Sequence, residues 1–215
     1  MKVLVIAAHP DDEVLGVGGT ILKHTANGDD VYVCIVTKAY EPNWSKEYIK
    51  NKLKEAKEVD KILGVKKRIF CNFPTTKLNT ISTGEFTEEI SNVIENVKPE
   101  IVYTHFKDDM NRDHGILFNA TLVASRPDMN KKISLMCFET LSSTEWGSVA
   151  FKPNVYTDIS DYIEEKIEAF LKYQTENKKY PHPRSPAGIK IWAKQRGVEI
   201  CVEYAEAFIL VREVR

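Results

Sequence analysis

The chain has 215 residues, and its 30 lysines and arginines are balanced by 31 aspartates and glutamates. This length suits a single domain, residues 1–215, with a substantial buried core. The charges are interspersed, so the sequence lacks the basic surface expected of a nucleic-acid-binding protein and has no polybasic membrane patch. Its apolar runs are far shorter than the ~18 residues of a membrane span. We therefore expect a soluble, cytoplasmic protein that acts on a small molecule, with homo-oligomerisation left open.

The four cysteines follow neither a metal-binding nor a disulfide pattern. Cys34, Cys71, Cys137 and Cys201 are widely spaced, and no C-x-x-C pair occurs. We expect them to be reduced residues of the core.

Strand-like and helix-like segments alternate along the chain. Apolar, β-rich runs predict strands at residues 3–8, 31–37, 66–71, 101–104, 133–138, 155–159 and 204–214. Helical spacing and capping residues predict helices at residues 14–26, 45–63, 84–97, 116–124, 161–173 and 186–195, the fifth opened by a capping box from Asp161 to Glu164. This alternation predicts an α/β fold with right-handed connections around a parallel sheet.

The first strand ends at a cluster of polar side chains that includes His9, Asp11 and Asp12. In open parallel sheets, the loops beyond the carboxyl ends of the strands form the ligand crevice. His9 and Asp12 are three positions apart across Pro10, so an imidazole nitrogen and a carboxylate oxygen can converge on one ion. Asp11 lies beside them. The set suits a zinc ion that carries a water, with a base next to it.

This segment is open to two other interpretations. Aspartate often caps helices and proline is common at the first helical position, so P-D-D-E alone is also compatible with a plain helix start. A dinucleotide site at Gly16, Gly18 and Gly19 is disfavoured, because the G-x-G-x-x-G register is absent and the acids repel a pyrophosphate.

A second polar cluster, H-F-K-D-D-M-N-R-D-H-G at residues 105–115, follows the fourth predicted strand. Because the carboxyl ends of parallel strands meet at one edge of a sheet, the two clusters are expected to face each other.

Three motifs, in this order, resemble the landmarks of the LmbE/PIG-L-type zinc-dependent de-N-acetylases: H-P-D-D-E, D-x-N-x-D-H and Y-A-E-A-F. The resemblance covers nearly the whole chain and implies a Rossmann-like three-layer sandwich with a mostly parallel central sheet and an active site at the carboxyl ends of the strands. It implies a hydrolase that removes an acetyl group from an N-acetylated amino sugar or its nucleotide conjugate. The N-x-D-H form and Y-P-H-P-R-S resemble a bacterial branch associated with sugar and sugar-nucleotide pathways.

Family roles carry over to the matching residues. His9, Asp12 and His114 match the metal ligands, which implies one Zn²⁺ per chain; affinity alone does not exclude Fe²⁺ or another divalent ion. Asp11 matches the general base, which takes a proton from the zinc-bound water as that water attacks the acetamide carbonyl.

The chain departs from the familiar pattern at the residue that stabilises the oxyanion. Many relatives have a histidine where this chain has Asn111, whose amide is a weaker donor than an imidazolium. His182, which lies between two prolines, is a second candidate, and we expect it to be the donor with Asp113 or another carboxylate orienting it. The alternative for His182 is an ordinary surface-loop histidine.

Lys52, Asp108 and Arg184 are candidate substrate-binding residues. Lys52 stands where relatives often have an arginine, and it supplies the charge without a bidentate grip; the alternative is a solvated helix face. Asp108 and Asp113 are also candidates for holding a catalytic histidine in its tautomer. Glu206, in the last strand, requires a buried partner, for which Arg184 is one candidate.

Two other functions compete with an amidohydrolase. One is a metal-dependent hydrolase acting on phosphoesters or other amides, and the other is a non-catalytic sugar- or nucleotide-binding α/β module in which the acids are helix caps. Metal content separates the binding module from the two hydrolases, and acetate release separates the amidohydrolase from the other hydrolase.

Overall fold

A seven-stranded sheet in the order β3-β2-β1-β4-β5-β7-β6 forms the centre of the protein. The structure is a computed structural model that describes residues 1–129 and 131–214. The strands are β1 Lys2–Ala7, β2 Asp30–Lys38, β3 Lys67–Pro74, β4 Ile101–His105, β5 Ser134–Phe138, β6 Val155–Asp158 and β7 Ala205–Arg212. Strands β1 to β5 pair in parallel, whereas β7 runs antiparallel to both β5 and β6.

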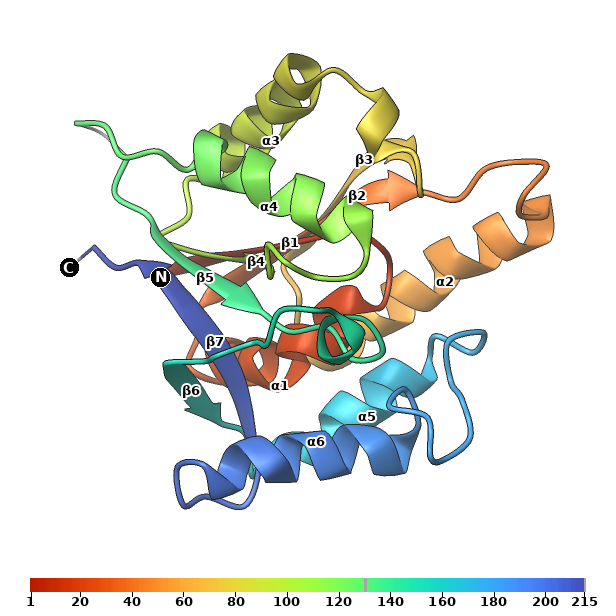
Figure 1. The fold of residues 1–215 in the computed structure, drawn as a ribbon, viewed down its shortest axis with the longest axis vertical. Helices are drawn as coiled ribbons and strands as arrows, with labels where there is room; N and C mark the ends of the chain where they lie inside the picture. Colours follow the sequence, from red (N-terminus) through yellow and green to blue (C-terminus); the bar gives the residue numbers. More distant parts are fainter. Residues whose placement is uncertain (130, 215) are drawn as a thin grey trace.

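Helices cover both faces of the sheet, which gives three layers (Figure 1). The α-helices are α1 Asp12–Ala26, α2 Lys46–Leu63, α3 Thr83–Val97, α4 Arg112–Ala124, α5 Ile163–Leu171 and α6 Pro186–Val198. Two short 3₁₀ turns, η1 Leu78–Thr80 and η2 Thr144–Trp146, lie in the connections. Helices α3 and α4 lie on one side of the sheet, and α1, α2, α5 and α6 lie on the other (Figure 1). This confirms the α/β fold with a parallel sheet that the sequence pattern predicts, and the mostly parallel three-layer sandwich that the family resemblance implies.

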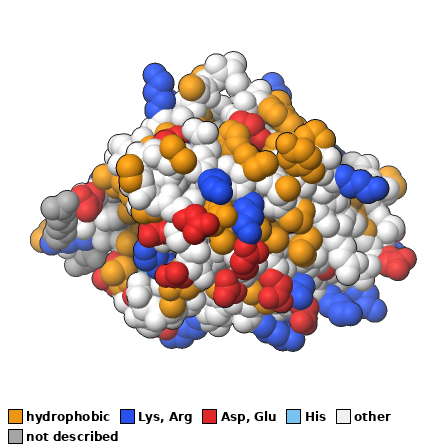
Figure 2. Space-filling model, turned by 90° about the horizontal axis from the view of Figure 1, so that it is seen from below, with side chains coloured by type: hydrophobic (Ala, Val, Ile, Leu, Met, Phe, Trp, Pro, Cys, Tyr) orange, Lys and Arg blue, Asp and Glu red, His pale blue; other side chains and the backbone are white. Residues whose placement is uncertain are grey.

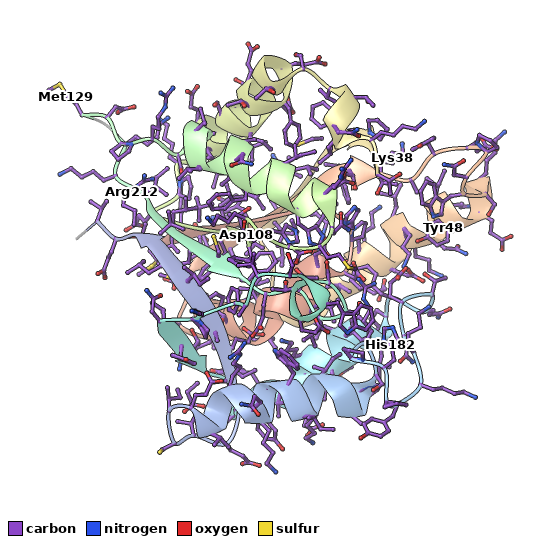
Figure 3. The ribbon with its side chains drawn as sticks, viewed as in Figure 1. Lys38, Tyr48, Asp108, Met129, His182 and Arg212 are labelled. Atoms are coloured by element: carbon purple, nitrogen blue, oxygen red, sulfur yellow. The ribbon has the colours of Figure 1, made fainter. Side chains whose placement is uncertain are left out.

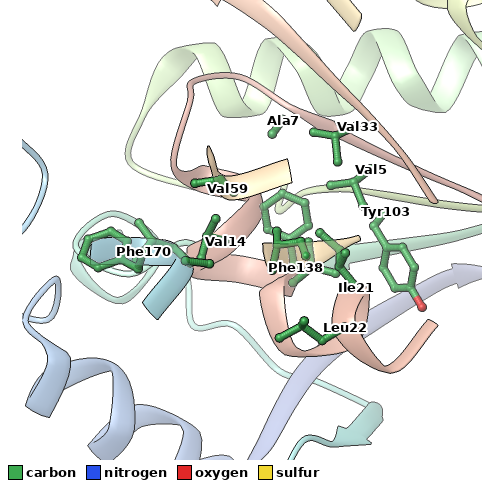
Figure 4. Packing of buried hydrophobic residues seen from close by; sticks show 14 of the residues in the cluster. Val5, Ala7, Val14, Ile21, Leu22, Val33, Val59, Tyr103, Phe138 and Phe170 are labelled. Atoms are coloured by element: carbon green, nitrogen blue, oxygen red, sulfur yellow. The ribbon is translucent and has the colours of Figure 1, made fainter. Parts of the chain in front are cut away.

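The larger core lies between the sheet and α1, where Phe138 is fully buried among side chains from several elements (Figure 4). Burying a phenylalanine stabilises the fold by roughly 1.5–3 kcal/mol. Helix α1 comes close enough to contact this ring because residue 16 is glycine: a Cβ there would lie 2.2 Å from Phe138 Cδ2. This packing fixes the position of α1, the helix that follows the first polar cluster.

The strand order places the two polar clusters next to each other. Strand β1 pairs with β2 on one side and with β4 on the other, so the order of strands reverses at β1 and β4. The loops that leave neighbouring strands at such a switch point diverge to opposite faces and leave a crevice between them. The loops after β1 and β4 carry the two clusters.

The structure also corrects several details of the sequence analysis. The predicted capping box at Asp161 is wrong, because α5 starts at Ile163 after Tyr162 and has no side-chain cap. Helix α4 starts at Arg112, four residues before the predicted 116, so the second cluster runs into its first turn. Cys201 is exposed and is not a core residue.

The surface carries charges of both signs. Figure 2 looks at the molecule from the α6 side and shows acidic and basic side chains interspersed over that face. Within the described part of the chain, none of the helices combines the length and the apolarity that a bilayer span requires.

Candidate metal centre and active site

Asp12, the first residue of α1, gathers three imidazole rings around one carboxylate oxygen. Its Oδ2 atom lies 3.1 Å from Nδ1 of His9, 3.3 Å from Nε2 of His114 and 3.4 Å from Nε2 of His105. The backbone N–H of His9 also donates to this oxygen, at 2.8 Å. The loop after β1 and the first turn of α4 therefore meet at one point, as the two clusters were expected to do.

His9, Asp12 and His114 have the donor atoms and the spacing of a metal site. One ligand atom from each lies within 4.8 Å of the others. Both ring nitrogens of His114 are buried without a well-directed hydrogen bond, although Nε2 faces Asp12. A buried nitrogen without such a bond, beside a carboxylate and a second imidazole, suits a divalent ion bound by nitrogen and oxygen. Among residues 1–129 and 131–214, this is the one group that meets these criteria.

Each of the two histidines has a carboxylate at its other ring nitrogen. Nε2 of His9 lies 3.1 Å from Asp113 Oδ2, and Nδ1 of His114 lies 3.1 Å from Asp109 Oδ1. Such carboxylates fix the ring tautomer and make the ligating nitrogen more basic. Asp113 therefore faces His9, and it also accepts from the N–H of Thr76 at 2.7 Å. Asp109, which contacts His114, was missed by sequence reasoning although it opens the D-x-N-x-D-H motif.

The charges of the cluster favour a cation at its centre. Burial opposes ionisation of Asp12, but His114 and His9, whose own pKa values are raised, hold the pKa of Asp12 well below its ordinary value. Burial also opposes protonation of His9, but Asp12 and Asp113 outweigh it and raise the pKa of His9 to about 10. The carboxylates thus stabilise positive charge beside this ring, whether a proton or a metal ion supplies it.

His105, the last residue of β4, is a neutral support for the site. Burial and the neighbouring His114 lower the pKa of His105 to about 4. Its Nε2 accepts from the N–H of Ala8 at 2.9 Å, and its Nδ1 lies 3.1 Å from the hydroxyl of Thr140. The ring stacks on His114 with the centroids 3.7 Å apart. It therefore helps to hold His114 in place, while its own lone pair is used by the backbone N–H of Ala8, the residue that follows β1.

Asp11 lies next to Asp12 in a strained backbone conformation, with φ 124° and ψ −30°. It precedes α1, but its side chain makes no capping bond and instead accepts from Arg184 NH1 at 2.9 Å. Burial raises the pKa of Asp11 to about 8 against the opposing charge of Arg184. A bound cation would lower this pKa toward neutrality, the range in which a general base is effective.

A cavity of about 250 Å³ opens beside this group. Its walls include the predicted site residues His9, Asp11, Lys52, Asn111 and Arg184. Strand ends contribute as well, from β2 and β3, and α2 supplies aromatic and apolar side chains. Figure 3 shows Lys38 and Tyr48, two further wall residues, on the same side of the molecule.

Two of the other predicted site residues lie outside the walls of this cavity. The ring of His182 packs edge-on against Trp146, with the centroids 5.7 Å apart, and its Nδ1 accepts from the N–H of Arg184 at 3.1 Å. Burial and the charges of Arg184 and Lys178 lower the pKa of His182. Asp108 is half-buried and lies 3.5 Å from Lys107.

Asn111 has a different position from His182. It is the N-cap of α4, and its Oδ1 accepts from the N–H of Asp113 at 3.0 Å. Because its oxygen is used by the helix, its NH₂ group is the part available to a molecule in the cavity.

The buried partner of Glu206 is Lys166, and the predicted pairing with Arg184 is wrong. Lys166 Nζ donates to Glu206 Oε1 at 2.6 Å, and the N–H groups of Gly19 and Thr20 donate to the same carboxylate at 2.8 and 2.7 Å. Glu206 therefore ties β7 to α1 and α5, and Arg184 is left to contact Asp11.

The chain is similar to several proteins that are named as deacetylases. The chain is 33% identical over 190 residues to a diacetylchitobiose deacetylase from Thermococcus kodakarensis, covering 81% of this chain and 70% of the relative. It is 25% identical to a Bacillus cereus protein named probable N-acetyl-α-D-glucosaminyl L-malate deacetylase 2, covering 81% of this chain and 83% of that protein. The solved N,N′-diacetylchitobiose deacetylase from Pyrococcus horikoshii has the same fold, with a TM-score of 0.81 and 23% identity over 98% of this chain and 83% of that one.

A family model described as GlcNAc-PI de-N-acetylase matches residues 4–125. This match takes in both polar clusters, including His9, Asp11, Asp12 and His114. It covers more than half of the chain, and the Thermococcus relative extends the likeness over most of the remainder. The chain belongs to the PIG-L family of de-N-acetylases.

Proposed function

We propose that the protein is a metal-dependent N-deacetylase that removes the acetyl group of an acetamido sugar. The observation that carries this proposal is the set of His9, Asp12 and His114, with ligand atoms within 4.8 Å of one another, beside the buried carboxylate of Asp11, which lines a cavity. Three ligands leave positions for water and substrate, as in other hydrolytic metal sites.

His9, Asp12 and His114 would hold the ion, with Asp113 and Asp109 orienting the two imidazoles. When bound, a divalent ion polarises a carbonyl and lowers the pKa of a water. Asp11 accepts a proton from the water that attacks the acetamide carbon. As the carbon–nitrogen bond breaks, Asp11 returns this proton to the nitrogen, so that acetate and a free amine leave. Arg184 keeps the carboxylate of Asp11 in place through its 2.9 Å bond.

The substrate we propose is a small acetylated amino sugar, alone or joined to a second group. Two relatives support this choice, because one is named for diacetylchitobiose and the other for a glucosaminyl malate. A nucleotide conjugate of an acetamido sugar stays part of the proposal. Zinc is the proposed ion, and iron is the alternative, since this ligand set does not exclude it by affinity.

Acetate release tests the proposal. Purified protein loaded with Zn²⁺ or Fe²⁺ is incubated with N-acetylglucosamine, N,N′-diacetylchitobiose and UDP-N-acetylglucosamine, and acetate is measured. Asp11→Asn is expected to keep the metal and lose ~10²–10⁴-fold in kcat, because its amide does not accept the proton of the water. His9→Ala is expected to lose stoichiometric metal by elemental analysis.

Other results would favour the competing functions. Phosphate release from phosphoesters without any acetate release would indicate a different hydrolase. Sugar binding by a protein that takes up no metal would indicate a non-catalytic binding module.

A further inference from the structure

Lysine and arginine side chains line the cavity beside His9, Asp12 and His114: they are Lys38, Lys52 and Arg184. Cations in such a position are a ready binding site for a carboxylate or a phosphate on the substrate. Lys38 is exposed at the end of β2, where water weakens its attraction for an anion. The ionic character of the cavity therefore depends on Lys52 and Arg184.

Glu176 occupies both of these cations from within the cavity wall. Its Oε1 lies 2.9 Å from Lys52 Nζ, and its Oε2 accepts from Arg184 NH1 at 3.2 Å. The hydroxyl of Tyr48 donates to Oε1 at 3.3 Å, which fixes the carboxylate further. The side chain of Lys52 is only 8% exposed, so its pairing with Glu176 is poorly screened by solvent.

Other carboxylates complete the neutralisation. Lys52 Nζ also lies 3.3 Å from Glu55 Oε2, and Arg184 is bound to Asp11. An anionic group that used Lys52 or Arg184 would have to displace Glu176 and leave this charge unpaired near Asp11. The rest of the wall offers aromatic surface, including Trp44 and Phe70, which suits the apolar face of a sugar ring.

We propose that Glu176 determines specificity: by occupying Lys52 and Arg184, it makes this cavity accept a neutral group, such as a second sugar ring, and reject a group that carries a carboxylate. The inference rests on the proposed deacetylase function and narrows its substrates: neutral acetamido sugars are favoured, and the malate glycoside and the nucleotide conjugate, which are anionic, are disfavoured. Glu176 acts by removing an attraction for anions, and it adds a repulsion of its own if it is displaced.

The experiment compares two substrates that differ in the charge of the group attached to N-acetylglucosamine. N,N′-diacetylchitobiose is neutral, and the malic acid glycoside of N-acetylglucosamine carries carboxylates. The zinc-loaded protein is expected to favour the neutral substrate by at least ~10-fold in kcat/KM. Glu176→Gln is expected to reduce this preference by at least ~10-fold, since Lys52 and Arg184 then become available for charge-assisted bonds.

Glu58→Gln is the matched control. Glu58 is on α2 and pairs with Lys61 on the exposed side of the helix, so this change removes the same charge away from the cavity. It is expected to leave the preference unchanged. A general loss of rate in Glu176→Gln, caused by a displaced Arg184, affects both substrates alike and cancels in the ratio.

Two kinetic results would overturn the inference: a wild-type preference for the malic acid glycoside, or an unchanged ratio in Glu176→Gln. If neither substrate releases acetate, the proposed function fails, and binding then decides the role of Glu176. Calorimetry measures the affinities for the two corresponding amine products without any turnover. The wild type must bind the neutral product more tightly, and Glu176→Gln must reduce this preference. Equal affinities for the two products in the wild type would reject the inference.

Discussion

The backbone N–H of Asp11 donates to the carboxylate of Glu13 at 3.0 Å, within the turn that presents the proposed base. Glu13 is completely buried, and its other oxygen accepts from Tyr173 at 2.6 Å and from Arg68 at 2.9 Å. A non-glycine residue with φ 124° carries strain of ~1–3 kcal/mol, which persists only where the surroundings enforce it. Glu13 supplies that constraint for Asp11.

We therefore predict that Glu13→Gln lowers kcat by ~10-fold or more while metal content stays stoichiometric. The two carboxylate oxygens of Glu13 now accept from three donors, whereas a glutamine has only one accepting oxygen. Either the N–H of Asp11 or the buried pair of Arg68 and Tyr173 then loses its acceptor. The measurement is steady-state kinetics together with elemental analysis.

Glu206→Gln is the control for this prediction, because Glu206 is also a buried carboxylate that accepts from backbone N–H groups of α1. It is expected to lower the melting temperature without changing kcat. A normal kcat in Glu13→Gln would show that the turn at Asp11 does not depend on this contact.

Asp108 and Asp109 are adjacent in sequence but differ in what they contact. Asp109 lies 3.1 Å from Nδ1 of His114, whereas Asp108 faces Lys107 near the surface. We predict that Asp109→Asn weakens metal binding by ~10–100-fold, the usual cost of losing a carboxylate behind a ligating histidine. Asp108→Asn, with the same change one residue earlier, is expected to leave the metal Kd unchanged. Competition with a chromophoric chelator measures both, and equal affinities would contradict the role of Asp109.

The sequence was sufficient to place both polar clusters at one edge of the sheet. Each cluster follows an apolar strand, and parallel strands bring their carboxyl ends together, so the two clusters were expected to face each other. The family resemblance then singled out His9, Asp12 and His114 within them. Local signals were equally informative at α2. Ser45 caps its first turn, and Gly64 ends it with φ 68° in the left-handed region.

Contacts between distant segments were harder to predict. Spacing does not show which of Asp108 and Asp109 turns toward His114, because this depends on the path of the loop after β4. Glu206 pairs with Lys166 of α5 because α5 packs beside α1, a relationship that no local pattern encodes. The role of Glu176 was not predicted, because in the sequence it is an acid in a polar segment, as a surface residue would be. Only the folded structure places Lys52 and Arg184 beside it.

The pair of Lys52 and Glu176 should also determine how stability varies with pH. Burial opposes the ionisation of both groups. For Glu176 the hydrogen bond and charge of Lys52 outweigh burial and lower its pKa, and for Lys52 those of Glu176 outweigh burial and raise its pKa. The charge of Glu176 contributes to the unfolding free energy above its ordinary pKa of ~4.3, and this contribution is lost as the pH falls through its lowered pKa. The charge of Lys52 contributes below its ordinary pKa of ~10.4, and this contribution is lost as the pH rises through its raised pKa.

We accordingly predict that the unfolding free energy of the wild type exceeds that of Glu176→Gln by a constant amount between about pH 6 and 9, and that this difference shrinks in acid. Urea unfolding at a series of pH values measures it. Glu58→Gln, whose carboxylate is exposed, is expected to differ little from the wild type at any pH. A difference that persists undiminished at pH 3 would show that Glu176 does not stabilise the fold through its charge.

The last prediction concerns the group that stabilises the oxyanion, where the chain departs from the more familiar family pattern. The sequence favoured an imidazolium at His182, oriented by Asp113. In the structure Asp113 is bound to His9 and Thr76, and Nδ1 of His182 accepts a hydrogen bond, so that ring nitrogen carries no proton. Because the pKa of His182 is also lowered, the ring is neutral at neutral pH and gives no charge-assisted bond.

Asn111 is better placed for this role, since it lines the cavity and its oxygen is held by the N–H of Asp113, which leaves its NH₂ group as the donor. Loss of one oxyanion donor costs ~10²–10³-fold in kcat. We predict a loss of this size for Asn111→Ala with metal retained, whereas His182→Gln keeps kcat within ~10-fold and keeps the shape of the pH–rate profile. Asn111→Asp retains an acceptor for the helix cap but no amide donor, and it should be as slow as Asn111→Ala. If His182→Gln instead loses ~10²-fold together with an alkaline limb of the profile, the donor is the imidazolium of His182.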